Sequence, residues 1–259
     1  FAGFADEART RPWERDSLVN VFSTTKGMTT ICALHLVDQG LLDLDAPVAT
    51  YWPEFKAGGK AELPVRPLLS HRAGLVAVKK PLPQGSLYDW EVMTQALAEQ
   101  EPWWTPGERH GYHALSFGFL VGEVVRRISG KSLGTYFREE IAEPLGLEFY
   151  IGLPEALEPR VAALVQGPIH ETEGPNLMEL IVTDPESLTA KAFANPPLDP
   201  TAANSREWRA AEIPAANGHG TAAALARVYA ALSVGGDLDG VHVLAPELIA
   251  ARILARTSA

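Results

Sequence analysis

The sequence has little of what several common protein classes require. Cys32 is the only cysteine among 259 residues, so an internal disulfide is excluded and packing alone must hold the fold. No apolar run approaches the roughly 20 residues of a membrane-spanning helix. Basic residues form no run longer than Lys79-Lys80 or Arg126-Arg127. These absences argue against a disulfide scaffold, a membrane-spanning helix and a basic nucleic-acid-binding segment.

The charge balance narrows the class of partner further. The chain has 22 Lys and Arg residues against 32 Asp and Glu residues, for a net charge of −10. We therefore expect neither nucleic acid nor an anionic membrane as a partner. A hydrophobic content of 46% is ordinary for a globular chain that is long enough to bury a core.

Location and assembly are less constrained by composition. The single cysteine suits a reducing compartment, so a cytoplasmic location is expected. The chain begins with Phe1 rather than Met, and removal of an upstream signal would instead indicate a periplasmic or secreted protein. Composition leaves the oligomeric state open.

Hydrophobic periodicity predicts the first elements. Residues 1–22 read as extended structure that ends in the buried β segment LVNVF. A helix of about 17 residues is predicted to begin at Ser23 and to end at Gly40. Residues 115–128 form an amphipathic pattern, with Glu123, Arg126 and Arg127 on the face opposite the apolar residues Phe117, Leu120, Val121, Val124 and Ile128.

Prolines and glycines punctuate the rest of the chain. Residues 41–110 indicate short helices and turns, and residues 167–214 indicate a long irregular loop of the kind that often lines a site. A helix is predicted at 221–233, followed by a short hairpin in DLDGVHVL. Pro246 is typical of the first turn of a last helix.

The stretch GKSLG, residues 130–134, matches the G-x-S-x-G pattern of a nucleophile elbow. An elbow needs a strand before the serine, whereas a helix is predicted before Ser132. Gly130 is better interpreted as a helix C-cap and Ser132 as the N-cap of the next helix. The context therefore predicts that Ser132 is not the nucleophile.

A second serine pattern, S-x-x-K, occurs at Ser23 and Lys26. Because the two residues lie one helical turn apart, their side chains share a face. A serine becomes a nucleophile when a neighbour takes its proton, and a lysine can do so only when burial or a helix dipole lowers its pKa. The alternative is an N-capping Ser23 with Lys26 extended into solvent, and the pattern alone leaves both open.

Tyr112 follows a Pro-Gly turn just before the amphipathic helix predicted at 115–128, where a phenol can face a cleft. A phenol needs an adjacent cation to carry protons near neutral pH, and Lys26 is the candidate. His71 is interpreted as a hydrogen-bonding residue that holds a loop. His110 and His113 flank Tyr112 without a third ligand type nearby, so no metal is expected.

Together these segments resemble the superfamily of class C β-lactamases, D-alanyl-D-alanine peptidases and family VIII carboxylesterases. The matching segments, in order, are VFSTTKG, LVDQGLLDLDAPVATYWPEF, LLSHRAGL, PGERHGYHALSFGFLVGEVVRRISGKSLGTYF and EPLGL. The resemblance implies an α/β (α+β) fold in which helices flank an antiparallel sheet beside a mostly helical domain. It predicts part of the α/β domain in residues 1–45, the helical domain in 46–205, and an incomplete return to the α/β domain in 206–259.

The same resemblance implies an acyl-enzyme mechanism without a cofactor, in which Ser23 attacks a carbonyl and Lys26 and Tyr112 relay protons. Ala114 stands where β-lactamases of this type have an asparagine, which favours the carboxylesterases. Trp104, His113 and His219 are further candidates for substrate contact. Members of these families carry a third motif, Lys-Thr-Gly or His-x-Gly, on a sheet strand. His219-Gly220-Thr221 resembles it only superficially, because the segment is expected to lead into a helix rather than to lie on a strand.

Three functions remain as hypotheses. The first is a serine carboxylesterase that hydrolyses short-chain esters. The second keeps the site but takes β-lactams or D-alanyl peptides, so that the substrate is a small ester or amide in both cases. The third is a non-catalytic or truncated acyl-binding homologue, because the chain is expected to lack the first and last sheet elements of a protein of roughly 400 residues.

Overall fold

The computed structural model describes residues 2–165, 167, 177–197 and 201–254. Within them, a small antiparallel sheet has the strand order β1-β3-β2, with bounds Val19–Asn20, His219–Gly220 and Phe149–Tyr150 respectively. The central strand β3 pairs Gly220 with Val19 on one side and with Phe149 on the other. The sheet therefore joins three segments that are far apart in the sequence.

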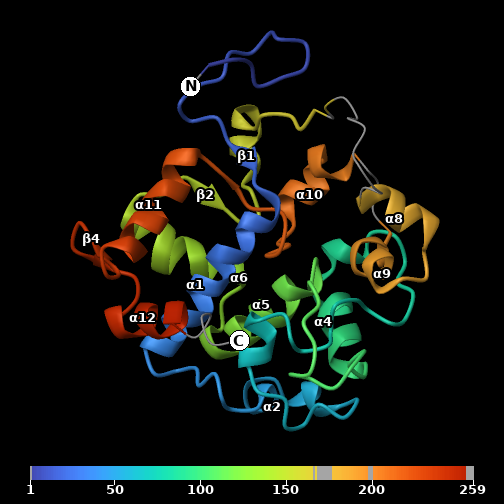
Figure 1. Cartoon of the computed structure of the whole chain (residues 1–259). Coiled ribbons are helices and arrows are strands. Elements are labelled where there is room, and N and C mark those ends of the chain that lie inside the picture. The colour runs from blue at the N-terminus through green and yellow to red at the C-terminus, as the bar shows by residue number, and fades with distance from the viewer. Residues whose placement is uncertain (1, 166, 168–176, 198–200, 255–259) are drawn as a thin grey trace.

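Helix α1, Thr25–Asp38, follows β1 through a 3-10 turn at Phe22–Thr24 and is the central helix of the core. It packs against α5, Ser116–Ser129, and α6, Leu133–Phe137. In the view of Figure 1, α1 runs through the middle of the molecule between α11 and α4. Gly40 and Gly130, with φ of 70° and 71°, end α1 and α5 where the left-handed backbone favours glycine.

Shorter elements surround this core. The other α-helices are α2 Val48–Tyr51, α3 Arg66–Leu69, α4 Trp90–Glu99, α7 Glu143–Leu145, α8 Leu177–Thr183, α9 Leu188–Ala194, α10 Arg206–Ala210, α11 Ala222–Ser233 and α12 Pro246–Leu254. Tighter or wider helical turns lie at Pro53–Lys56, Ser86–Tyr88, Arg138–Ala142, Glu155–Arg160 and Ala202–Asn204. A hairpin is formed by β4 Asp237–Leu238 and β5 Val241–His242. Every helix in the described ranges is too short or too polar to cross a membrane.

Most sequence predictions for the elements are confirmed. The helices expected from Ser23, at 115–128, at 221–233 and from Pro246 are α1, α5, α11 and α12, and the hairpin lies where DLDGVHVL placed it. The sheet takes one strand from each of the three predicted domain segments, whose boundaries remain a prediction.

Two predictions were wrong. Residues 167–214 are not uniformly irregular, because α8, α9 and α10 lie within them; Ser187 and Ser205 cap α9 and α10 by accepting hydrogen bonds from Ala190 N and Trp208 N. Residues 168–176 and 198–200 of that stretch lie outside the described residues. Glu123 does not face solvent but is fully buried in α5.

Candidate active site

Ser23 lies at the junction of the sheet and α1. Val21 N donates to Gly218 O at 2.9 Å, which holds the chain against the segment that leads into β3. Thr25 Oγ1 donates to Phe22 O at 2.5 Å and accepts from Gly218 N at 2.9 Å. Phe22 has a φ of 43°, a strained conformation for a bulky residue, so these contacts hold a tight turn immediately before Ser23.

Lys26 lies one turn further along, with its Nζ 3.2 Å from Ser23 Oγ. The side chain is buried, and its Nζ also donates to Ala114 O at 2.8 Å and to Ala215 O at 2.9 Å. Burial lowers the pKa of Lys26 to about 7. A substantial fraction of this lysine is therefore neutral near neutral pH.

The contacts of Lys26 suit a proton acceptor. A neutral amine has two N–H donors and one lone pair, and the two carbonyl oxygens accept from both donors. The lone pair is then left for the hydroxyl proton of Ser23. Main-chain carbonyls therefore orient the lysine toward the nucleophile without placing a carboxylate beside it, which would keep it charged.

Tyr112 completes the group from the segment before α5. Its Oη donates to Ser23 Oγ at 2.6 Å, although 89 positions separate the two residues. Lys26 Nζ lies 4.7 Å from the centroid of the Tyr112 ring. The tyrosine side of the site is open, since Tyr112 is 42% exposed. The structure thus brings together the three residues predicted to be catalytic.

Polar residues that sequence reasoning missed hold the segment that carries Ala215 O. Thr29 Oγ1 donates to Pro214 O at 2.6 Å, and Asn20 Nδ2 donates to Ala216 O at 3.1 Å. Asn217 Oδ1 accepts from the main-chain N of residue 213 at 2.9 Å. The only sequence signal for Thr29 was its position one turn beyond Lys26, because all of these contacts involve main-chain atoms.

The structure buries His113 and His219, two residues predicted to contact substrate, and that contact remains a prediction. His113 is fully buried, with Nε2 accepting from Leu75 N at 3.2 Å and Nδ1 donating to Gly111 O at 2.7 Å. His219 is also fully buried, and its Nδ1 donates to Asn217 O at 2.7 Å. Burial lowers the pKa of both to about 4, so both rings are neutral packing groups.

The expected position of the His219 segment also needs correction. We expected residues 218–220 to lead into a helix away from any sheet strand. Instead, His219 and Gly220 form the central strand β3, because the short strands β1 and β2 pair with both of its edges. Thr221 then caps α11 by accepting from Ala224 N at 3.1 Å.

Trp104 lies beside the segment that carries Tyr112. The ring is half-buried with Trp103 in a small apolar cluster that includes Val76 and Ala114, and its Nε1 donates to Arg109 O at 3.2 Å. Gly111 packs against this ring, so closely that an added methyl group would clash with it. Substrate contact by Trp104 remains a prediction.

Ser132 has the capping position that its context predicted. Its Oγ accepts from Thr135 N at 3.3 Å at the start of α6 and donates to Glu212 Oε1 at 2.6 Å. Gly134 N donates to the other oxygen of Glu212 at 2.8 Å. Ser132 therefore joins α6 to the segment before β3, and its partners are not those of an activated nucleophile.

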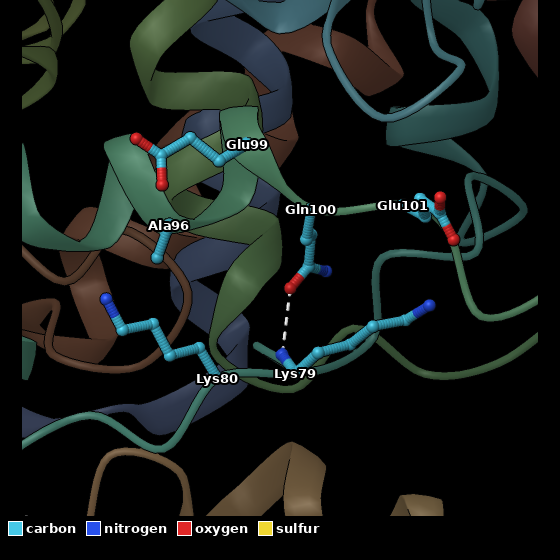
Figure 2. Close-up of a pocket in the computed structure, with 6 residues that line it drawn as sticks. All are labelled: Lys79, Lys80, Ala96, Glu99, Gln100 and Glu101. Carbon is cyan, nitrogen blue, oxygen red and sulfur yellow. Dashed lines mark hydrogen bonds between the residues drawn. The ribbon is translucent and has the colours of Figure 1, made fainter.

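None of these residues lines a hollow of about 320 Å³ whose lining residues are drawn in Figure 2. It is lined by Lys79, Lys80, Ala96, Glu99, Gln100 and Glu101, and Lys79 N donates to Gln100 Oε1 at 2.8 Å. Its charged groups are of both signs and include none of the three predicted catalytic residues. Among the described residues, no group of three His, Cys, Asp or Glu side chains could hold a metal ion.

Comparison with known proteins agrees with this geometry. A family model described as Beta-lactamase matches residues 1–258. Esterase/beta-lactamase LipL from Mycobacterium tuberculosis is 40% identical over 264 residues, which cover 95% of this chain and 58% of LipL. Esterase EstB from Burkholderia gladioli is 30% identical over 162 residues, covering 56% of this chain and 41% of EstB.

Solved structures show the same fold. A family VIII carboxylesterase structure has 43% sequence identity and a TM-score of 0.85, covering 96% of this chain and 64% of that chain. A penicillin-binding protein homologue from Caulobacter crescentus has 39% identity and a TM-score of 0.84, with the same coverage of 96% and 64%. The chain thus spans less than two thirds of the length of each of these relatives. With a family match over almost every residue and these close structural neighbours, the chain belongs to the beta-lactamase family.

Proposed function

We propose that this protein is a serine carboxylesterase that hydrolyses short-chain esters through an acyl-enzyme on Ser23. The observation that carries the proposal is the position of Ser23 Oγ, 3.2 Å from Lys26 Nζ and 2.6 Å from Tyr112 Oη. The esterase names of LipL and EstB support this substrate class.

Acylation uses the buried lysine as the base. Neutral Lys26 takes the Ser23 hydroxyl proton as Oγ forms a bond to the ester carbonyl carbon. The main-chain N–H of Ser23 supplies one hydrogen bond to the carbonyl oxygen, on which negative charge develops. When the intermediate collapses, the bond to the alkoxy oxygen breaks, and the alcohol leaves with a proton delivered through Tyr112.

Deacylation follows the reverse path. A water molecule gives up a proton to the Lys26 and Tyr112 pair as its oxygen attacks the acyl carbon. The bond between the acyl carbon and Ser23 Oγ then breaks, and the proton returns to Oγ. One carboxylic acid and one alcohol are released for each water consumed, and the enzyme is regenerated.

A second candidate activity is hydrolysis of β-lactams, favoured by the double name of LipL as an esterase/beta-lactamase. Ala114 argues against it as the main activity, because a methyl group that is 3% exposed offers no hydrogen bond to a lactam side chain. Comparing turnover of p-nitrophenyl butyrate with that of a chromogenic cephalosporin separates the two activities. Preferential turnover of the cephalosporin would reverse the assignment.

The nucleophile is tested with a fluorophosphonate probe and intact-protein mass. We expect one label, on Ser23, and no label or ester hydrolysis in Ser23→Ala. Ser132→Ala is the matched control, since Ser132 has the same hydroxyl but lies in a helix cap; its rate should stay within about 5-fold of wild type. Absence of any label would favour a non-catalytic acyl-binding protein, and equal losses in both variants would refute the assignment of Ser23.

A further inference from the structure

His71 has an uncommon backbone conformation close to the candidate active site. It lies in the turn after α3 with a φ of 59°, in the left-handed region that few residues other than glycine occupy. Such a conformation persists only where surrounding contacts hold it, and it is often found at functional sites. The residues in contact with His71 therefore indicate which part of the site this conformation serves.

All three residues from Gly111 to His113 are in contact with His71. Its main-chain O accepts from Gly111 N at 3.0 Å, and its ring Nδ1 accepts from His113 N at 3.1 Å. The His71 ring packs on the Tyr112 ring, with centroids 5.0 Å apart and planes at 47°. His71 therefore holds Tyr112 in three ways: through the residue before it, through the residue after it, and through packing on its ring.

The His71 ring is itself held in place. The Phe117 ring of α5 packs against it, with centroids 5.1 Å apart. Burial, with the nearby His113, Lys26 and His110, lowers the pKa of His71 to about 3. A neutral ring can leave Nδ1 unprotonated, as acceptance from His113 N requires, and it adds no positive charge beside Lys26.

We propose that His71 is a positioning residue for Tyr112, holding its Oη within hydrogen-bond distance of Ser23 Oγ. The inference rests on the proposed function and assigns its proton-transfer step a support outside the three catalytic residues. His71 acts through Tyr112 and does not touch substrate, so its loss should lower kcat while leaving KM nearly unchanged.

Two substitutions separate the parts of this role. His71→Asn tolerates the left-handed backbone and keeps an acceptor for His113 N, but it removes the ring that packs on Tyr112. His71→Gly keeps only the backbone freedom. We expect kcat for p-nitrophenyl butyrate to fall about 100-fold in His71→Gly and about 10-fold in His71→Asn, with KM within about 3-fold of wild type in both.

A double-mutant cycle distinguishes positioning from general stabilisation of the fold. In a Tyr112→Phe background, which has no phenol to position, His71→Asn should change the fluorophosphonate labelling rate by less than about 3-fold. If His71→Asn instead lowers the labelling rate by the same factor in the Tyr112→Phe background as in the wild-type background, His71 does not act through Tyr112 and the proposal is overturned. A change in KM as large as the change in kcat would overturn it as well. Should His71→Gly fail to fold, His71→Asn decides alone.

The controls separate this inference from the proposed function. His35→Asn removes another buried histidine, one that hydrogen-bonds Tyr136 Oη at 2.8 Å, and it should lower the Tm without changing the kcat of the folded fraction. Full labelling of Ser23→Ala would refute the esterase mechanism itself. Loss of labelling in Ser23→Ala together with wild-type kcat in both His71 variants would refute only the role of His71.

Discussion

In the proposed mechanism, the protonation state of Lys26 sets the rate at which Ser23 reacts. Burial brings its pKa to about 7, so the amine is charged below that pH and gains its lone pair above it. We therefore expect the fluorophosphonate labelling rate of Ser23 to rise with pH and to reach half its maximum near pH 7. The rate is measured by intact-protein mass over a series of buffers.

An arginine at the same position is the control for this pH dependence. Lys26→Arg keeps a positive charge but stays protonated throughout, so labelling should be lost at every pH. A labelling rate in the wild-type protein that does not vary from about pH 5 to pH 9 would show that Lys26 is not the base.

At the scale of the element, α5 is held by a buried carboxylate. The Glu123 side chain accepts from Arg126 Nε, Arg127 Nε and Trp90 Nε1, each at 2.7 Å. Burial acts to raise the pKa of Glu123, but these hydrogen bonds outweigh it and hold the pKa below its ordinary value. The carboxylate joins α5 to α4, which begins at Trp90.

Glu123→Ala should lower the free energy of unfolding by about 3 kcal/mol, because it removes the buried partner of two arginines. Glu91 also pairs with Arg126, at 3.4 Å, but its side chain is 76% exposed, so Glu91→Ala should cost less than about 0.5 kcal/mol. Urea unfolding of both variants makes the comparison. Similar losses of unfolding free energy in the two variants would show that the buried carboxylate of Glu123 stabilises the protein no more than the exposed one of Glu91.

The effect of Glu123 should also depend on pH. Since its folded-state pKa is below the unfolded value, its stabilisation is complete above the ordinary carboxyl pKa and is lost as pH falls through the folded-state pKa. The difference in stability between wild type and Glu123→Ala should therefore shrink in acid.

At the scale of the whole molecule, the site depends on how closely α5 approaches the segment before β3. A Cβ added at Gly118 of α5 would lie 2.5 Å from Ala215 N and 2.8 Å from Pro214 C, both of which are main-chain atoms. A flexible side chain could move away from the added Cβ. This main chain accepts hydrogen bonds from Thr29 and Lys26, so moving it would cost free energy. Only glycine therefore fits at this contact.

Gly118→Ala should destabilise the protein by about 2 kcal/mol and lower kcat about 100-fold, because moving the segment also moves the carbonyl of Ala215 away from Lys26. Gly167→Ala is the control, since an added Cβ there meets no atom of the described residues within 4 Å. Thermal unfolding and ester turnover are measured together. Loss of stability with wild-type kcat would show that the segment does not position the base.

Prediction from the sequence worked where the signal is local. Gly40 ends α1 and Ser132 caps α6, and both could be recognised from one helical turn of sequence. The serine capping signals of α9 and α10 were missed because the crowded prolines around them favoured a loop. Glu123 was misplaced because helical periodicity gives the face of a residue but not which other helices cover that face.

The candidate site, like the fold, could be predicted where its signals lie close together in the sequence. Ser23 and Lys26 share a local pattern, while Tyr112 was selected for its position after a Pro-Gly turn at the start of a helix, and the family resemblance then assigned it a role in proton transfer. The burial of His113 and His219 was not predicted, because the position of a histidine close to a motif in sequence does not reveal whether its side chain is buried. The role of His71 depends on contacts across 42 positions, which no pattern in the sequence displays.

Two of the three groups that hydrogen-bond with Lys26 Nζ are the main-chain carbonyl oxygens of Ala114 and Ala215, and every amino acid carries such an oxygen. Replacing the side chain at either position leaves the oxygen in the chain, provided that the backbone keeps its path. Divergent relatives can therefore lose all side-chain identity at these positions and still inherit the environment of the base together with the fold. Surveys that search for invariant side chains would record the lysine and overlook most of what orients it.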